Sequence, residues 1–418
     1  MTRMALGLAT LTGVLGTATG CAGAHAPAST PTSGEATHAP KQLQPRQIIV
    51  ALAAEARERL AAVKQALAAE YQLVEMGSFP LESVGLECVV FQVAPGRSDA
   101  ELLARLAADP RVALAQRNEV FRGMAQPRTE PAGPLAYGAA LIHADSAQRT
   151  RTGKGIRVAV IDTGVARDHP GLHGRIAATQ NFVDGGERSF ERDRHGTAVA
   201  GVIAAGGDGA RVHGIAPDAE VLAIKACWYA GVDDERALCS SWTLAKSLDF
   251  AITAGAHVVN MSLSGPVDEL LARLIARAHE RGMITVAAAE EEGDAPGFPA
   301  SLPAVIAVLA SDDRGQVRLP AWTAQTAALA APGVDILTTV PSDGWDFLSG
   351  SSLAAAHVTG VVALLREQSP RLSAGEALDV LKSTARAMPR DVRGPAREVG
   401  LVDACAALAR LMRLASCP

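Results

Sequence analysis

Between residues 156 and 309, short uninterrupted apolar runs alternate with helix-forming stretches. A strand that is apolar along its whole length must be buried on both faces, which is typical of a parallel sheet with helices on either side. The alternation therefore predicts one α/β domain over residues 139–418. Its expected strands and helices are Ile156–Ile161, His195–Ala205, Val221–Ala226, Thr243–Ala254, His257–Leu263, Asp268–Arg281, Met283–Ala289 and Val305–Leu309, followed by helices at Ser351–Glu367, Gly375–Thr384 and Val402–Leu414.

A second, smaller unit is expected at residues 47–122, where the pattern reads β-α-β-β-α-β. This order suits a ferredoxin-like α+β fold. Its elements are predicted at Gln47–Leu52, Ala54–Tyr71, Tyr71–Met76, Leu86–Val93, Ala100–Ala108 and Val112–Phe121. Residues 123–138 are rich in Pro, Gly and charge and lack periodicity, so they mark a boundary between units. A precursor would be cut in this region, at a point between about Val120 and Tyr137.

The N-terminus has the pattern of a secretory signal over residues 1–21. Arg3 precedes a weakly apolar run, and small residues lead directly into Cys21, which resembles a bacterial lipoprotein signal. Two outcomes stay open: lipidation of Cys21, with attachment to the membrane, or simple secretion. Residues 22–46 contain mainly Ala, Pro, Thr, Ser and His and are predicted to form a flexible linker. The chain is therefore expected to be exported, as a periplasmic protein, an outer-membrane-anchored lipoprotein or a secreted protein.

The composition bounds the classes of function. Hydrophobic residues make up 48% of the chain, which is enough for a sizeable core. A net charge of −5 and only 4% aromatic residues argue against nucleic-acid binding. The six cysteines lack the short paired spacings of a zinc site.

The cysteines are interpreted one at a time. Cys88 is expected to be a buried core residue. Cys227 and Cys239 flank a polar loop, Trp228 to Leu238, and in an exported protein such a pair is expected to form a disulfide. Cys405 and Cys417 form a second candidate pair, whose geometry the sequence does not define.

Three residues have positions that suit nucleophilic catalysis. Asp162 ends a buried strand, where functional sites collect in open α/β sheets. His195 begins a helix of small residues, and Ser352 lies at the N-terminus of a buried helix, where backbone N–H groups face any anion. Each alone has a plain structural explanation, as a turn residue, a helix cap or an N-terminal helix residue. Together they supply a nucleophile, a base and a carboxylate that orients the base.

The order Asp, His, Ser and the surrounding motifs resemble the subtilase family over roughly residues 137–367. The motifs are Asp162-Thr163-Gly164, His195-Gly196-Thr197 and Gly350-Ser351-Ser352-Leu353-Ala354. The resemblance implies a subtilisin-like three-layer sandwich with a mainly parallel sheet, and a serine endopeptidase that acts on polypeptides. It implies that Asp162 orients, His195 acts as base and then acid, and Ser352 attacks the scissile carbonyl. It also implies that Ser262, Leu263 and Ser264 offer backbone groups to an extended substrate.

The same resemblance identifies the N-terminal unit as an intramolecular chaperone and inhibitory propeptide. The chain's partners would then be polypeptide substrates and its own propeptide, and it is expected to act as a monomer. An esterase of the α/β-hydrolase class is disfavoured, because its Gly-x-Ser-x-Gly elbow is missing around Ser352 and its triad order differs.

One departure from the family pattern affects the oxyanion site. The family supplies a side-chain donor from Asn, but Glu291 occupies that position in Glu290-Glu291-Glu292. An ionised carboxylate would repel the oxyanion, whereas a protonated Glu291 could donate a hydrogen bond. A third interpretation turns Glu291 into solvent. The alternative function is therefore a weakened or inactive subtilase fold that binds peptides or proteins.

No metal and no cofactor are expected. His169-Pro170-Gly171-Leu172 has Gly where calcium-binding subtilases have an Asp ligand. Asp208, in the 206–211 loop, offers one further oxygen, but a calcium ion takes about six to eight.

Overall fold

A computed structural model of the chain describes residues 46–53, 59–127, 136–207, 210–231, 234–324, 326–388 and 399–417. The predicted signal, Cys21, nearly all of the predicted linker and Asp208 lie outside these residues. Among the helices of the described segments, none has the length and apolar character that crossing a membrane requires.

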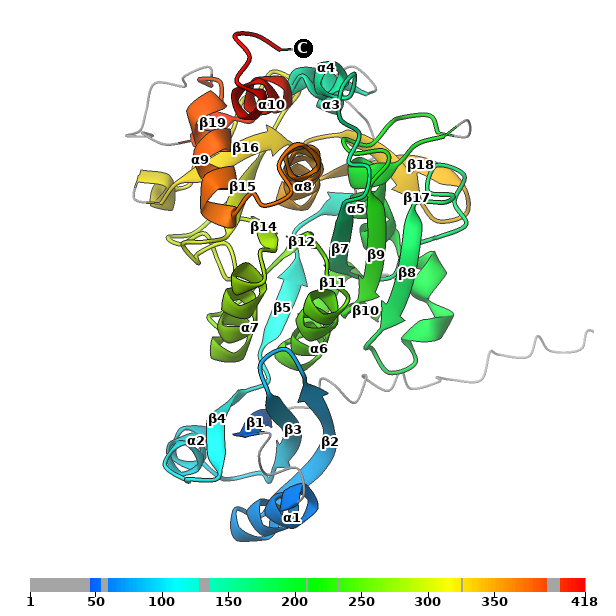
Figure 1. The fold of residues 1–418 in the computed structure, drawn as a ribbon. Coiled ribbons are helices and arrows are strands. Elements are labelled where there is room, and N and C mark those ends of the chain that lie inside the picture. The colour runs from blue at the N-terminus through cyan, green and yellow to red at the C-terminus, as the bar shows by residue number, and fades with distance from the viewer. Residues whose placement is uncertain are drawn as a thin grey trace, which may run out of the picture. The chain divides into compact units, whose positions relative to one another are not determined.

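The larger sheet contains, within the described residues, eight parallel strands in the order β19-β16-β15-β14-β12-β7-β9-β8 (Figure 1). Its strands are β7 (Arg157–Asp162), β8 (Ile176–Asn181), β9 (Glu220–Lys225), β12 (Val258–Met261), β14 (Ile284–Ala288), β15 (Ile306–Ser311), β16 (Ala328–Pro332) and β19 (Val399–Leu401). The predicted α/β class is therefore confirmed.

Alternate residues of the buried strands point into two different cores. Val158 and Val160 of β7 pack with the helices α5 (Arg194–Ala204) and α8 (Ser351–Gln368). Ala159 and Ile161 belong to the core that includes α6 (Ser241–Thr253) and α7 (Glu269–Glu280). Since successive strand residues face opposite sides of a sheet, this alternation produces the three layers of the domain. The C-terminal helices are α9 (Ala374–Thr384) and α10 (Ala404–Met412).

The N-terminal unit has the predicted β-α-β-β-α-β order. It consists of β1 (Gln47–Ala53), α1 (Leu60–Glu70), β2 (Leu73–Leu81), β3 (Leu86–Val93), α2 (Asp99–Ala107) and β4 (Val112–Arg117). The described strands form an antiparallel sheet in the order β2-β3-β1-β4, which is the ferredoxin-like arrangement. One face of this sheet packs on α1 and α2, while Ile49, Cys88 and Val90 on the other face join the core of α6 and α7. Cys88 is buried and unpaired, as predicted.

The expected strand Val112–Phe121 is wrong, because the chain forms two strands in different sheets. β4 ends at Arg117, and β5 (Val120–Gly123) pairs with strands of the larger domain. Between them the chain turns onto the start of α6, where the Trp242 N–H donates to the Asn118 side chain (3.1 Å) and the Glu119 N–H donates to Ser241 Oγ (2.9 Å). The pattern of apolar residues does not show this turn, because β4 and β5 both contain apolar residues and together look like one continuous strand.

The expected polar loop between Cys227 and Cys239 is a β-hairpin. β10 (Cys227–Gly231) pairs antiparallel with β11 (Asp234–Ser240), and Cys227 lies directly opposite Cys239. A disulfide joins these two residues, and a second disulfide joins Cys405 and Cys417. The hairpin was missed because its polar residues do not alternate with apolar ones.

Several further elements were not predicted. The expected strand His257–Leu263 divides into β12 and a short strand β13 (Leu263–Ser264) of another sheet. The structure adds β6 (Gln126–Pro127), β17 (Ile336–Val340), β18 (Gly344–Ser349), the helices α3 (Tyr137–Leu141) and α4 (Ala144–Ala147), and 3-10 turns at Gly186–Arg188, Phe190–Arg192 and Ala321–Ala324.

Candidate active site

The structure brings Asp162, His195 and Ser352 together at one edge of the larger sheet. His195 Nδ1 lies 2.7 Å from Asp162 Oδ1, and His195 Nε2 lies 3.1 Å from Ser352 Oγ. All three residues are buried, with Asp162 and His195 only 3% and 5% exposed and Ser352 fully covered. A proton can therefore pass from Ser352 Oγ to His195 Nε2, while Asp162 holds the other ring nitrogen.

Secondary structure fixes each of these side chains. Asp162 is the last residue of β7, and its Oδ1 also accepts from the Thr163 N–H (2.6 Å). His195 lies in the first turn of α5, and Ser352 is the second residue of α8. The N-terminus of α8 lies at the same point, and the backbone N–H groups of its first turn favour negative charge there.

The segment after β4 runs through this site. β5 lies between β11 and β13, with Arg122 opposite Leu238 on one side and Gly123 opposite Leu263 on the other. The next residue, Met124, donates its N–H to the Ser262 carbonyl (3.3 Å). The backbone of residues 262–264 thus binds an extended strand, and that strand is part of the same chain.

Met124 presents its carbonyl to the nucleophile. Its oxygen accepts from the Ser352 N–H at 3.3 Å, and its own N–H lies 3.1 Å from Ser352 Oγ. Beyond it, Gln126 pairs with Ser349 and Pro127 with Leu348 of β18. The peptide bond between Met124 and Ala125 therefore lies at the start of α8, with paired strand on both sides.

Glu291 follows β14 and is half-buried near the same helix start. Burial raises the pKa of its carboxyl, whereas a hydrogen bond from the Ser351 N–H and the charge of Arg318 lower it; Glu292 and Glu290 raise it further. Glu292 is exposed and pairs with Arg318 at 3.0 Å. Glu291 is thus the one of the three glutamates that contacts the backbone beside Ser352, and the interpretation that places it in open solvent does not fit this structure.

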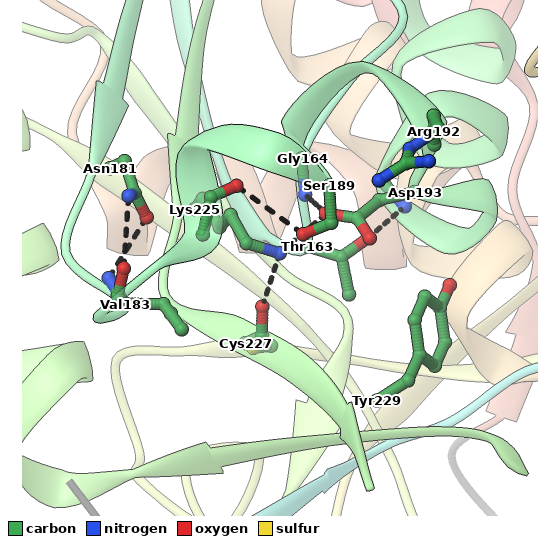
Figure 2. Close-up of polar contacts among 12 residues, drawn as sticks. Thr163, Gly164, Asn181, Val183, Ser189, Arg192, Asp193, Lys225, Cys227 and Tyr229 are labelled. Atoms are coloured by element: carbon green, nitrogen blue, oxygen red, sulfur yellow. Dashed lines mark hydrogen bonds and ion pairs between the residues drawn. The ribbon is translucent and has the colours of Figure 1, made fainter. Parts of the chain in front are cut away.

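A buried ion pair between Lys225 and Asp193, which lies two residues before His195 in the chain, was not foreseen from the sequence (Figure 2). Lys225, the last residue of β9, is fully buried; its ammonium donates to the Asp193 carboxylate and to the Cys227 carbonyl (3.0 Å). Asp193 also accepts from the Gly164 N–H (2.8 Å), so it joins the loop after Asp162 to the start of α5. The sequence signal that could have indicated this ion pair is Lys225 directly after the apolar run of β9, because a charge buried at such a position needs a partner.

Two further bonds fix the start of α5, one to β10 and one to the loop after Asp162. The His195 N–H donates to the Tyr229 hydroxyl (2.9 Å), and the Gly196 N–H donates to Thr163 Oγ1 (2.9 Å). Burial raises the pKa of the Tyr229 hydroxyl, so it stays protonated. Burial likewise raises the pKa of Asp193, against the opposing effect of the Lys225 charge. The histidine and its carboxylate are therefore oriented by a network that reaches three strands.

Comparisons with known proteins agree with this geometry. The subtilase family model matches residues 153–402. Subtilisin DY of Bacillus licheniformis is 34% identical over 258 residues, which cover 60% of this chain and 91% of that protein. The alkaline protease of Alkalihalobacillus alcalophilus is 30% identical over 338 residues (80% and 82%), and subtilisin E of Bacillus subtilis (strain 168) is 32% identical over 294 residues (69% and 74%).

The fold and these relatives define a serine-type peptidase of the subtilisin-like class. The chain belongs to the subtilase family.

Proposed function

We propose that this protein is an exported serine endopeptidase that hydrolyses peptide bonds through an acyl-enzyme on Ser352. His195 Nε2 takes the hydroxyl proton as Ser352 Oγ bonds to the scissile carbonyl carbon. The oxyanion forms against the Ser352 N–H, and Asp162 stabilises the imidazolium through Nδ1. His195 then gives its proton to the leaving amine. A water molecule enters, loses a proton to His195 and releases the acid by the same steps in reverse order.

One observation supports this assignment more than any other. A peptide carbonyl of the chain, that of Met124, accepts from the Ser352 N–H at 3.3 Å while the triad distances are 2.7 and 3.1 Å. A site built for another reaction would have no reason to hold an extended backbone in this register.

We propose further that residues 47–124 act as a propeptide and that the precursor cuts its own Met124–Ala125 bond. This bond lies within the range predicted for the cut, Val120 to Tyr137, and extends the propeptide two residues beyond its predicted end at residue 122. In the uncut chain the segment lies between β11 and β13, beside the triad, so it would inhibit for as long as it stays there.

Contacts between the two units support tight docking. Gln116 accepts from the Leu270 N–H (3.0 Å) and donates to Asp268 (2.8 Å), at the start of α7. The Ser83 N–H donates to the buried Asp249 carboxylate of α6 (2.8 Å). The Gln116 contact satisfies a helix N–H that would otherwise face water, and the Ser83 contact gives a hydrogen-bond donor to a buried carboxylate.

The proposal that the protein is exported rests on the signal-like pattern at residues 1–21. The exported chain would then be either lipidated at Cys21 and attached to the membrane, or simply secreted. Metabolic labelling with a radioactive fatty acid separates them, because a lipidated chain retains the label and a Cys21→Ser chain does not.

The function is tested by the rate of casein and peptide cleavage by the purified protein beside Ser352→Ala. Cleavage that disappears in the variant supports the peptidase. Equal rates in both proteins would refute it, and labelling by a phosphonate probe checks whether Ser352 is activated.

A further inference from the structure

Gly123 precedes the residue whose carbonyl faces Ser352, and its backbone has no need of glycine. Its φ is not among the positive values that favour this residue. The strand is ordinary extended backbone, paired with Leu263 on one side. Any reason for glycine at this position must therefore come from the space around its Cα.

The methyl group of Ala237 fills the space beside the Cα of Gly123. A Cβ placed on Gly123 would lie 3.0 Å from the Cβ of Ala237, which is closer than carbon atoms normally approach. The same Cβ would lie 3.6 Å from His195 Nε2 and 3.7 Å from Cε1, which are ordinary contacts. Ala237 is thus the obstacle, and the catalytic imidazole is not.

Ala237 has little freedom to give way. A methyl group has no alternative rotamer, so relief requires a shift of the β11 backbone. β11 is paired to β10 with Tyr229 opposite Ala237, and the Cys227–Cys239 disulfide joins the same two strands. Tyr229 is in turn held by the His195 N–H (2.9 Å), so a shift of β11 would disturb the triad.

The substrate strand has equally little room to retreat. Moving it away from Ala237 would press it onto β13, where the Met124 N–H is bonded to the Ser262 carbonyl (3.3 Å). A shift would also draw the Met124 carbonyl away from the Ser352 N–H (3.3 Å). A side chain larger than that of glycine at position 123 therefore either strains the strand or moves the Met124 carbonyl out of line with Ser352.

We propose that Ala237 makes this protein select peptides that have glycine immediately before the residue whose carbonyl is attacked. The inference rests on the proposed function and defines its substrate class: extended segments in which a glycine and one further residue precede the cut. Ala237 is the residue that determines this specificity.

The test uses five full-length chains: wild type, Gly123→Ala, Ala237→Gly, the double variant and the control Gly77→Ala. Self-cleavage is followed by mass spectrometry of the product that begins at Ala125. Gly123→Ala is expected to slow it about tenfold, the rate effect of about 1.4 kcal/mol. The double variant should recover the rate of the Ala237→Gly chain. Gly77→Ala is the matched control, because a Cβ at Gly77 meets no atom within 4 Å; its rate should equal that of wild type.

A second measurement does not depend on catalysis. In a Ser352→Ala background, hydrogen exchange of the backbone at residues 121–124 reports how firmly the strand is seated. Gly123→Ala should raise the exchange rate there, and Ala237→Gly should restore protection.

The two measurements separate the two proposals. If no chain cleaves itself and the mature region digests no peptide, the proposed function fails, and exchange alone decides the role of Ala237. The proposed specificity is overturned if Gly123→Ala cleaves itself at the wild-type rate. If no chain cleaves itself, it is overturned if Gly123→Ala shows the wild-type exchange rate at residues 121–124. It is also overturned if adding Ala237→Gly to Gly123→Ala restores neither the cleavage rate nor the protection.

Discussion

Replacing Glu291 by Asn should raise turnover, by an amount that depends on pH. Among the described residues, the Ser352 N–H is the donor bonded to the Met124 carbonyl oxygen (3.3 Å), and the proposed mechanism places the oxyanion at this oxygen. In subtilisin, removal of the second, side-chain donor lowers turnover about 10²–10³-fold, or about 2.7–4 kcal/mol. Where Glu291 is ionised, Glu291→Asn should therefore restore a factor of about 10².

The pH dependence follows from the direction of the Glu291 pKa. Burial raises this pKa, so the carboxyl keeps its proton to a higher pH than an exposed glutamate. Below the pKa, Glu291 can donate an O–H and the advantage of Asn shrinks; above it, Glu291 is an anion and the advantage is complete. Any other effect of pH that both enzymes share cancels in the ratio of their kcat values, so this ratio isolates the effect of residue 291.

The assay is kcat against pH for both proteins on one peptide, with Glu292→Asn as matched control. Glu292 is 76% exposed and pairs with Arg318, so its replacement should leave kcat unchanged at a pH where Glu291 is fully ionised. A Glu291→Asn ratio near one at every pH would show that this side chain does not reach the oxyanion, and the argument would fail.

Three further predictions concern the surrounding structure. Lys225→Met leaves the Asp193 charge buried without its partner, so the free energy of unfolding, measured in urea, should fall by about 3–5 kcal/mol. Adding Asp193→Asn should recover much of this loss. Equal stability of Lys225→Met and wild type would contradict the prediction. Replacing Cys227 and Cys239 together by Ser should cost about 3 kcal/mol in the same assay, because the cross-link no longer restricts the unfolded chain, and unchanged stability would contradict this. The Ser352→Ala precursor should keep its full length on a gel, whereas a mature band would mean cleavage by another agent.

Much of the site could be predicted because its residues belong to short contiguous motifs. The positions of Asp162 at a strand end and Ser352 at a helix start follow from local apolar pattern, and the structure places both there. Lys225 could have been noticed as a charge at the end of an apolar strand, but its partner is 32 residues away. Nothing local to Asp193 identifies which cation neutralises it.

The hairpin β10–β11 and the strand β5 show where pattern fails. Neither has clear alternation of apolar and polar residues, because each is stabilised by pairing with a neighbour rather than by one buried face. β10 and β11 pair with each other, whereas β5 pairs with β11 and β13 from distant parts of the chain, and a strand's partner is not encoded in its own sequence.

By itself, the sequence determined the layered α/β class, the three triad residues and the cysteine pair 227–239, since each depends on periodicity or on short motifs. Only the tertiary structure decided that Met124 faces Ser352, that Ala237 closes the space beside Gly123, and that Glu291 lies half-buried at the start of α8. Met124 and Ser352 are 228 positions apart, and contacts over such separations form only when the whole core is packed.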